Sequence, residues 1–417
     1  MQEEHVLSPY RVLDLTDEKG QFCGKILADL GCDVIKIEKP GRDPARNIGP
    51  FYHDIADPER SLFWFAYNTN KRSITLDIET VDGQEIIRRL VKGSDFILES
   101  FAPGHLDKLG LGYLQLGDIN PRIIMTSITP FGQSGSYRDY KGPDIVVTAM
   151  SGFMYLCGDA DRAPVRISAS QIYLHASLEA AEGTLVAHYH REQTGQGQHV
   201  DVSAQESLVC LMLGAHFDWL DNNGEIYTHR DGNFRSREIG GRTRSLFPCK
   251  DGSIALFLMG GHIGARTNRA IVDWMDSEGM ADDTLKSINW DEWQPQRVPQ
   301  EEIDLVEGAF IRFFSKHTKD ELFQRARECG MLVAPVSNIE DQLNSPQLDS
   351  RGFWQSVEHP DLGAKLSYPG LPFESSCFAR RGPHRAPHVG EHNEEIYLGE
   401  LGLTQEAFIA MKQAGVF

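Results

Sequence analysis

The alternation of short apolar strand patterns with helical patterns through the first 130 residues constrains the fold of this chain more than any other feature. Apolar residues cluster at 12–15, helical spacing follows at 22–30, and a second strand pattern covers 33–38. Further strands are predicted at 73–77, 96–99 and 122–127, with a helix at 84–91. Because strands that alternate with helices form mostly parallel sheets, we predict an α/β fold with a Rossmann-like large domain.

A change of composition in the middle of the chain predicts a second domain. After a predicted helix at 174–190 and a strand at 198–202, residues 221–244 are polar and rich in Gly, Asn and Arg, which is typical of a linker. Beyond it, Lys250-Asp251-Gly252 lies at the centre of a predicted hairpin, and helices are expected at 265–280 and 303–314. We therefore expect a smaller domain after the linker, and a last helix at 405–413.

The charge balance and the cysteines exclude several classes of function. The chain has 60 acidic and 41 basic residues, a formal net charge of −19, which argues against general nucleic-acid binding. The 7 cysteines include no CxxC pair, and His188 and His190 do not share a helix face. We therefore expect neither a disulfide framework nor a metal site.

The sequence shows neither a signal peptide nor a membrane span. Its amino terminus carries acidic residues where a signal peptide has basic ones, and no stretch reaches the ~20 apolar residues needed to cross a bilayer. We expect a cytoplasmic protein without a membrane partner.

The best candidate for an anion site is the basic segment Lys36, Lys39, Arg42 and Arg46. It lies at the end of the first βαβ unit, where doubly wound sheets place their ligand crevice. The alternative is a solvated basic loop, since runs of charge usually lie on the surface. The pair Lys71-Arg72 carries the same two interpretations.

Two other features give weaker signals. Gly260 and Gly261 follow a predicted strand and precede a helix, so their N–H groups could hold an anion, although a flexible turn is the simpler interpretation. Asp144 stands at the start of a predicted helix and is most simply its N-cap, with a catalytic role as the alternative.

Several stretches, taken in order, resemble the family III CoA-transferases. They are RVLDLT from Arg11, LADLGCDVIKIEKPGRDPAR from Leu27, NKRSITLD from Asn70, ESFAPGHLDKLGLGY from Glu99, NPRIIMTSITPFGQSG from Asn120 and TGQGQHVDVS from Thr194. The carboxy-terminal SPQLDSRGF, YPGLPF and GEHNEEIYLGELG extend the similarity almost to the end of the chain. Each stretch is weak alone, but their order is specific.

The resemblance implies a large Rossmann-like domain built from both ends of the chain, a smaller inserted α+β domain, and two chains interlinked in a dimer. The expected division is 1–220 for the first part of the large domain, 221–244 for the linker, 245–335 for the small domain and 336–417 for a return segment that packs on the large domain. CoA would be a substrate, with no cofactor besides. The implied CoA contacts are Arg42, Arg46, Leu76, Ser100, Phe101 and Lys108, with Gly260 and Gly261 as a glycine loop.

The position of the family's nucleophile is where this sequence departs most from the family. In the transferases a carboxylate attacks the thioester carbonyl and forms a mixed anhydride, followed by an enzyme-bound thioester. The stretch PVRISASQIYLHAS from Pro164 aligns without gaps to the family's PxRxGxxIADLxxG, and Tyr173 stands where the family has its aspartate. A phenol, with a pKa of about 10, stays mostly neutral, and its ester would not reproduce the anhydride.

Three hypotheses follow for function. The first is a non-catalytic subunit of a heteromeric CoA-transferase, which works beside a homologous aspartate-bearing subunit and moves CoA between an acyl-CoA, such as succinyl-CoA, and an organic acid. The second is a self-sufficient transferase that uses another carboxylate, either Asp144 or Glu179. The third is a CoA-binding protein without turnover.

Overall fold

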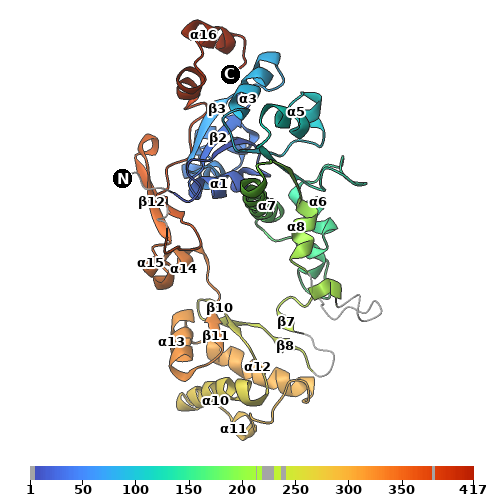
Figure 1. The fold of residues 1–417 in the computed structure, drawn as a ribbon. Helices are drawn as coiled ribbons and strands as arrows, with labels where there is room; N and C mark the ends of the chain where they lie inside the picture. Colours follow the sequence, from blue (N-terminus) through green and yellow to red (C-terminus); the bar gives the residue numbers. More distant parts are fainter. Residues whose placement is uncertain (1–4, 213, 218–229, 236–240, 378–380) are drawn as a thin grey trace. The chain divides into compact units, whose positions relative to one another are not determined.

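The computed structural model describes residues 5–212, 214–217, 230–235, 241–377 and 381–417 (Figure 1). The chain divides into two compact units: residues 1–153, 167–211 and 346–417 form the first, and residues 154–166 and 212–345 form the second. The second unit thus begins earlier and ends later than the expected small domain at 245–335. Of the expected linker 221–244, residues 221–229 and 236–240 lie outside the described residues.

The first unit is built on a sheet of six parallel strands. These are β1 (Arg11–Leu15), β2 (Asp33–Glu38), β3 (Lys71–Thr75), β4 (Phe96–Glu99), β5 (Ile124–Thr129) and β6 (His199–Ser203), in the order β3-β2-β1-β4-β5-β6. Every residue of β4 and β5 is buried, as expected for a parallel sheet that helices cover on both faces. The α/β, Rossmann-like prediction is confirmed.

Alternate residues of each strand enter two separate cores. Val12 and Val34 face the core formed with α1 (Gln21–Asp29), α6 (Asp144–Met150), α7 (Ile172–Thr194) and α8 (Ala204–Cys210). Leu13 and Ile35 face the opposite core, which contains α3 (Val81–Val91), α5 (Tyr113–Ile119) and α16 (Gln405–Gln413). The period of two along each strand therefore sets which helix layer each side chain contacts.

The carboxy-terminal segment belongs to the first unit. It contains the short helix α15 (Pro346–Ser350), the antiparallel hairpin of β12 (Trp354–His359) and β13 (Ala364–Pro369), the helical turn η6 (Glu395–Glu400) and α16; helix α14 (Ile339–Leu343), just before it, belongs to the second unit. The hydroxyl of Tyr397 donates to the carbonyl of Thr75 at 2.6 Å, and the N–H of Asp77 donates to the carbonyl of Val416 at 2.7 Å. These bonds tie the end of the chain to the end of β3.

Short elements fill the long connection between β2 and β3, which the strand and helix patterns did not predict. They are η1 (Pro44–Asn47), η2 (Tyr52–Asp54), η3 (Pro58–Arg60) and α2 (Leu62–Tyr67), and a further short helix, α4 (His105–Lys108), follows β4. Ser61 caps α2 by accepting the N–H of Trp64 at 3.1 Å, so α2 begins where a side chain satisfies its first free donors.

The second unit contains a three-stranded antiparallel sheet, in the order β11-β10-β9, packed against helices. Its elements are β7 (Phe234–Arg235), β8 (Thr243–Arg244), β9 (Leu246–Cys249), β10 (Gly252–Leu256), α10 (Gly261–Ser277), α11 (Asp283–Ser287), α12 (Gln300–Phe314), α13 (Lys319–Cys329) and β11 (Val333–Pro335). The pairing of Gly252 with Cys249 confirms the predicted hairpin. Its core combines aliphatic residues with aromatic ones, among them Trp290, Trp293, Phe310 and Phe313.

The described residues contain neither a membrane-spanning helix nor a cluster of metal ligands. None of the helices among them is long and apolar enough to cross a bilayer. The same part of the chain holds no group of three His, Cys, Asp or Glu side chains placed to bind a metal ion.

Candidate active site

The carboxyl ends of β1 and β4 border a cavity in the first unit. Strands β2 and β3 extend the sheet on one side of β1, and β5 and β6 extend it beyond β4 on the other side. The loops that leave β1 and β4 therefore diverge, and ligands of doubly wound folds bind in the crevice between such loops. The cavity there has a volume of about 840 Å³ and is walled by Glu18 and Lys19 after β1, by residues 100–103 after β4, and by Pro130 after β5.

Four cations line this cavity: Lys19, Lys108, Arg138 and Lys141. Lys19 pairs with Asp17, and Arg138 lies 3.4 Å from Asp139. Lys108 and Lys141 are exposed, and among the described residues neither has an ion-pair partner within 4.0 Å. The rim of the cavity therefore has positive charge available for an anionic ligand, although the chain as a whole is acidic.

Aromatic rings provide the apolar part of the wall: Phe63, Tyr67, Phe101, Tyr140 and Tyr173. The rings of Phe63 and Tyr67 lie 4.7 Å apart between centroids, and Phe101 stacks on His105 at 4.8 Å. Aromatic walls with a few charged groups are typical of small-molecule sites, and such rings can stack on a heteroaromatic base.

Ser100 joins the two loops that form the base of the cavity. Its hydroxyl donates to the carboxylate of Asp17 at 2.8 Å and accepts the N–H of the same residue at 2.9 Å. The segment after β4 is thereby fixed to the segment after β1 at the point where the two chain paths diverge.

Tyr173 lies in the first turn of α7, and its ring is half-buried in the cavity wall. The phenol donates its hydrogen to the backbone carbonyl of Gly142. Burial raises the pKa of Tyr173 above its ordinary value, and the negative charges of Asp17, Glu18 and Asp144 raise it further. The phenol is therefore neutral near pH 7, with its proton engaged by Gly142, and it is a poor nucleophile.

Asp144 lies in the same wall but does not cap its own helix, so the N-cap expectation is wrong. The N-cap of α6 is Pro143, and Asp144 is the first helical residue. Its Oδ1 instead accepts the N–H groups of Gln171 at 3.0 Å and Ile172 at 3.2 Å, at the start of α7. The side chain could reach this second helix only because the fold brings the two helix starts together.

Five of the residues singled out from the sequence meet in this cavity: Ser100, Phe101, Lys108, Asp144 and Tyr173. Arg42 and Leu76 are not part of its wall. Arg42 is exposed beyond β2, and Leu76 is 2% exposed within the hydrophobic core. Glu179 is exposed on α7 and also lies outside the cavity wall.

Arg46 is fully buried and ion-paired. Its guanidinium donates to both carboxylate oxygens of Glu38 at 2.7 and 2.8 Å, to Glu59 at 3.1 Å and to the carbonyl of Pro387 at 2.9 Å. It also lies 3.7 Å from the centroid of the Trp64 ring. All three of its side-chain nitrogens are engaged by protein acceptors around η1, and Arg46 is not part of the cavity wall.

The other cations of the basic segment form neither a common anion site nor a fully solvated loop, the two interpretations that the sequence left open. Lys36 is buried against Asp43 at 3.0 Å, while Lys39 is exposed. Lys71 is also buried, and its ammonium donates to Asp14 at 2.8 Å. Asp43, just before η1, and Asp14 on β1 thus supply the acids for the two buried lysines, because burial of a charge requires a paired partner.

Gly260 and Gly261 belong to the second unit, where they form the start of α10. A Cβ at Gly260 would lie 2.3 Å from the carbonyl oxygen of Trp293, and Gly261 has φ of +69°. Packing at one position and backbone conformation at the other explain both glycines.

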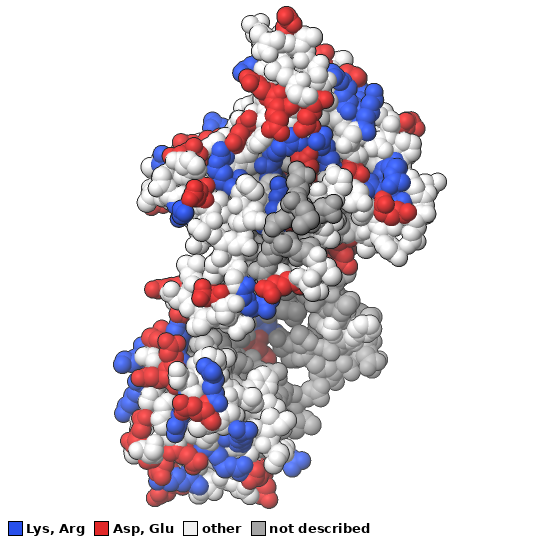
Figure 2. Space-filling model, turned by 60° about the vertical axis from the view of Figure 1, so that its left-hand side comes forward, with Lys and Arg blue, Asp and Glu red and all other residues white. Residues whose placement is uncertain are grey.

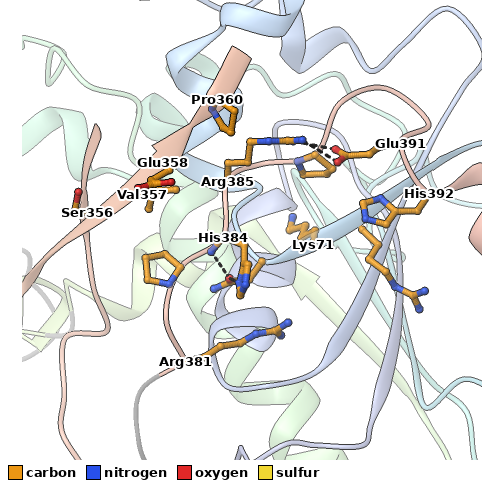
Figure 3. Close-up of a pocket in the computed structure, with 14 residues that line it drawn as sticks. Lys71, Ser356, Val357, Glu358, Pro360, Arg381, His384, Arg385, Glu391 and His392 are labelled. Atoms are coloured by element: carbon orange, nitrogen blue, oxygen red, sulfur yellow. Dashed lines mark hydrogen bonds and ion pairs between the residues drawn. The ribbon is translucent and has the colours of Figure 1, made fainter. Parts of the chain in front are cut away.

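A second cavity, of about 590 Å³, lies at the opposite, amino end of β3 and is bordered by β12 and the segment 381–392 (Figure 3). Four cations line it, but three are paired: Lys71 with Asp14, Arg72 with Asp33 at 2.6 Å, and Arg385 with Glu391 at 2.8 Å. Blue and red side chains accordingly lie next to each other on the face drawn in Figure 2. The better candidate for an anionic ligand is the cavity at β1 and β4.

Sequence reasoning missed three of the four cations of that cavity, namely Lys19, Arg138 and Lys141. Lys19 lies in the loop that leaves the carboxyl end of β1, so the strand order would have identified it. The loop 138–143 carries no local signal, because its position against α7 depends on the bonds made by Tyr173 and Asp144.

Comparison with known proteins agrees with the motifs. Residues 7–393 match the family model for CoA-transferase family III. The chain is 38% identical over 392 residues to the succinyl-CoA:(R)-benzylsuccinate CoA-transferase subunit BbsE of Thauera aromatica, with 93% of each chain covered. It is 30% identical over 411 residues to the succinyl-CoA–L-malate CoA-transferase beta subunit of Chloroflexus aurantiacus, with 96% of this chain and 95% of that protein covered.

Among solved structures, a CAIB/BAIF family protein from Brucella suis superposes with a TM-score of 0.82 at 25% identity, covering 95% of this chain and 100% of that one. The family match spans both units of the chain and nearly all of the described elements. This chain is therefore a member of the family III CoA-transferases.

Proposed function

We propose that this chain is the non-catalytic subunit of a heteromeric CoA-transferase that moves CoA from an acyl-CoA, such as succinyl-CoA, to an organic acid. A homologous subunit supplies the nucleophilic aspartate. The observation that carries the proposal is the neutral phenol of Tyr173, bonded to Gly142 in the cavity wall where the family motif has a carboxylate. Two relatives whose names call them subunits of CoA-transferases support a heteromer.

The cavity at β1 and β4 holds the CoA moiety in this proposal. Lys108, Arg138 and Lys141 bind its phosphates at the rim, while Phe101 stacks on the adenine and Ser100 fixes the loop beneath it. Arg42 is exposed and can add a phosphate contact from beyond β2. Arg46 and Leu76 contribute through packing.

The partner subunit's aspartate performs the covalent steps. Its carboxylate attacks the acyl carbonyl and the CoA thiolate leaves, which gives a mixed anhydride; the thiolate then attacks the aspartyl carbonyl, releasing the first acid and leaving a CoA thioester on the enzyme. The acceptor's carboxylate reverses these steps to form the new acyl-CoA. An anhydride is sensitive to water, so a subunit that only closes the site still contributes to the yield.

The two homologous subunits pair as two interlinked chains related by a pseudo-twofold axis. A homodimer of this family would use the same surface on both chains, and replacement of one copy by a paralogue keeps that geometry. The nearly complete match to the family, over residues 7–393, supports a chain that retains its assembly surfaces.

The acceptor is an organic acid with an aromatic portion, such as an aromatic dicarboxylate. Five aromatic side chains in one cavity wall support this choice, because they offer apolar area and edge or face contacts to a ring. The name of the Thauera aromatica relative specifies benzylsuccinate, an acid of this kind.

Co-expression with a paralogous chain that carries the aspartate tests the heteromer. A stable complex should form, substitution of the partner's aspartate should abolish transfer, and Tyr173→Phe in this chain should leave most of the activity. Full activity from a homo-oligomer of this chain, in the absence of an aspartate-bearing partner, would refute the proposal.

Calorimetry tests the CoA cavity in this chain alone. The double variant Lys108→Ala/Arg138→Ala should weaken CoA binding at least tenfold, because two charge-assisted phosphate contacts are lost, and the loss should shrink at high salt. Lys92→Ala, an exposed lysine at the end of α3, is the matched control. Equal affinities for the double variant and the control would remove the cavity as the CoA site.

A self-sufficient transferase that uses Asp144 is the second candidate, since this carboxylate lies in the same wall as Tyr173. Its Oδ1 is engaged by two N–H groups, which reduces its nucleophilicity. Intact-mass analysis after incubation with succinyl-CoA separates the two candidates: an adduct mapped to Asp144 would establish it as the nucleophile, and no adduct is expected if Tyr173 marks a non-catalytic subunit.

A further inference from the structure

Glu99 is a buried carboxyl group behind the wall of the CoA cavity. It is the last residue of β4, is 5% exposed and precedes Ser100 and Phe101, which line the cavity. Glu99 itself is not part of the wall. Since it cannot meet CoA directly, any effect that it has on binding must pass through the loop that follows it.

The carboxylate of Glu99 holds that loop by its main chain. Its Oε2 accepts the N–H of Phe101 at 2.8 Å, and its Oε1 is 3.4 Å from the side-chain nitrogen of Gln133. The N–H of Phe101 thus makes a charge-assisted bond, which is the stronger class of hydrogen bond. The bond has this strength only while Glu99 is ionised.

A second set of contacts comes from the neighbouring strands. Glu99 lies opposite Ser127 in the β4–β5 pairing, and the Ser127 hydroxyl donates to it. The same hydroxyl oxygen is 2.8 Å from Nε2 of His199.

The charges around Glu99 favour its neutral form. Burial raises the pKa of Glu99 to about 7; Asp201 on β6 and Asp107 on α4 raise it, while the Ser127 hydroxyl and the N–H of Phe101 lower it. His199 faces it through Ser127, and Asp17 faces it through Ser100. Burial also lowers the pKa of His199, so the imidazole is mostly neutral near pH 7 and adds little compensating charge.

We propose that Glu99 is a positioning residue for CoA binding: its carboxylate holds the main chain of Phe101, and with it the cavity wall at 100–103, in the position that stacks on the base of CoA. Ser127 is the donor that stabilises this ionised form. The effect of Glu99 on CoA affinity rests on the proposed function. The hydrogen bond between Glu99 and Phe101 does not, since it is present in the free chain.

Hydrogen exchange of the Phe101 amide in the free protein tests the tie without CoA. After correction for the intrinsic exchange rate, its protection should rise about fivefold between pH 6 and pH 8, since a bond to a carboxylate is stronger than one to a carboxylic acid. Glu99→Gln should show no such rise, and Glu85→Gln, an exposed carboxylate on α3, should behave as the wild type. A rise that persists in Glu99→Gln overturns the proposal.

Calorimetry with CoA over the same pH range tests the link to binding. The wild-type affinity should increase about fivefold from pH 6 to pH 8, parallel to the protection of Phe101, and the increase should be absent in Glu99→Gln. Ser127→Ala should move the midpoint of both changes to higher pH, because a bond that favours the carboxylate is removed. A pH-independent wild-type affinity, with the exchange effect intact, overturns the positioning role.

The two failures can be told apart. If the wild type binds no CoA at any pH, the proposed function fails, while the exchange measurement still decides whether Glu99 holds Phe101. If CoA binds but Glu99→Gln keeps the wild-type pH profile, the proposed function stands and the role of Glu99 is refuted.

Discussion

The phenol of Tyr173 donates its hydrogen to the backbone carbonyl of Gly142 and so joins the start of α7 to the loop 138–143. The carboxylate of Asp144 makes a second tie between the same two segments, through the N–H groups of Gln171 and Ile172. Tyr173, which our proposal aligns with the family's nucleophile, therefore has a structural role in this chain: it fixes the wall that carries Arg138 and Lys141.

Removal of the Tyr173 hydroxyl should loosen this wall but leave the fold intact. Tyr173→Phe keeps the ring against its core neighbours and leaves the Gly142 carbonyl without its donor. We expect a loss of about 1 kcal/mol in the free energy of unfolding, measured by urea denaturation, and a loss of CoA affinity of about threefold, which leaves most of the activity at saturating acyl-CoA. Unchanged stability and affinity would show that the bond contributes nothing.

Introduction of a carboxylate at position 173 tests whether the cavity presents the geometry of the reaction. Tyr173→Asp should form a covalent CoA adduct with succinyl-CoA, detectable by intact mass, because the carboxylate lies in the first turn of α7, in the cavity wall. Tyr173→Asn, which has the same shape and no nucleophilic oxygen pair, should form none. Absence of an adduct in both variants would show that more than the nucleophile has been lost.

Asp144 should stabilise the amino terminus of α7. Asp144→Ala leaves the N–H groups of Gln171 and Ile172 without their acceptor, and it should lower the free energy of unfolding by about 1 kcal/mol. Asp144→Asn should lose less stability than Asp144→Ala, because the amide oxygen still accepts these two bonds. It should still be less stable than the wild type, because the negative charge near the positive end of the helix is gone. Urea denaturation of the two variants side by side checks this order.

Loss of Arg46 should damage the fold before it affects any ligand. Arg46→Met removes the partner of two buried or half-buried carboxylates, Glu38 and Glu59, and should cost about 3–5 kcal/mol of unfolding free energy. The double variant Arg46→Met/Glu38→Gln should recover part of that loss, because the unpaired buried charge is removed as well. Equal losses in the single and double variants would contradict the buried-pair explanation.

Glu99 should make the stability of the chain depend on pH between about pH 4.5 and pH 7. Its pKa rises from 4.5 in the unfolded chain to about 7 in the folded chain, so the folded state retains a proton that the unfolded state has released. The stabilising contribution is complete below pH 4.5 and declines as the pH rises through 7; at ~1.4 kcal/mol per pKa unit it amounts to about 3 kcal/mol. Unfolding curves of wild type and Glu99→Gln, measured from pH 4.5 to pH 8, should diverge accordingly, with the variant relatively more stable at pH 8.

The local sequence was sufficient to predict the strands of the large sheet and the main helices beside them, but not the short elements between β2 and β3. The apolar runs at β1, β2 and β4 and the helical spacing of α1 and α3 depend on residues that are neighbours in the chain, and these elements agree with the predicted ones to within a few residues. The order of the family motifs likewise placed Ser100, Phe101 and Lys108 at a common site, and these three line one cavity.

Only the tertiary structure decided what each charge does. Lys36, Arg46 and Lys39 look alike in the sequence, yet the first two are buried against acids that include Asp14 on β1 for Lys36 and Glu59 on η3 for Arg46, whereas the third is exposed. Burial of a cation depends on partners that the fold brings to it. The same holds for Glu99, whose pKa depends on solvent exclusion and on charges more than a hundred residues away, such as Asp201. The periodicity of the sequence predicts which side chains face inward. The ion pairs and the desolvation of charged groups depend on contacts between segments that only the folded chain brings together.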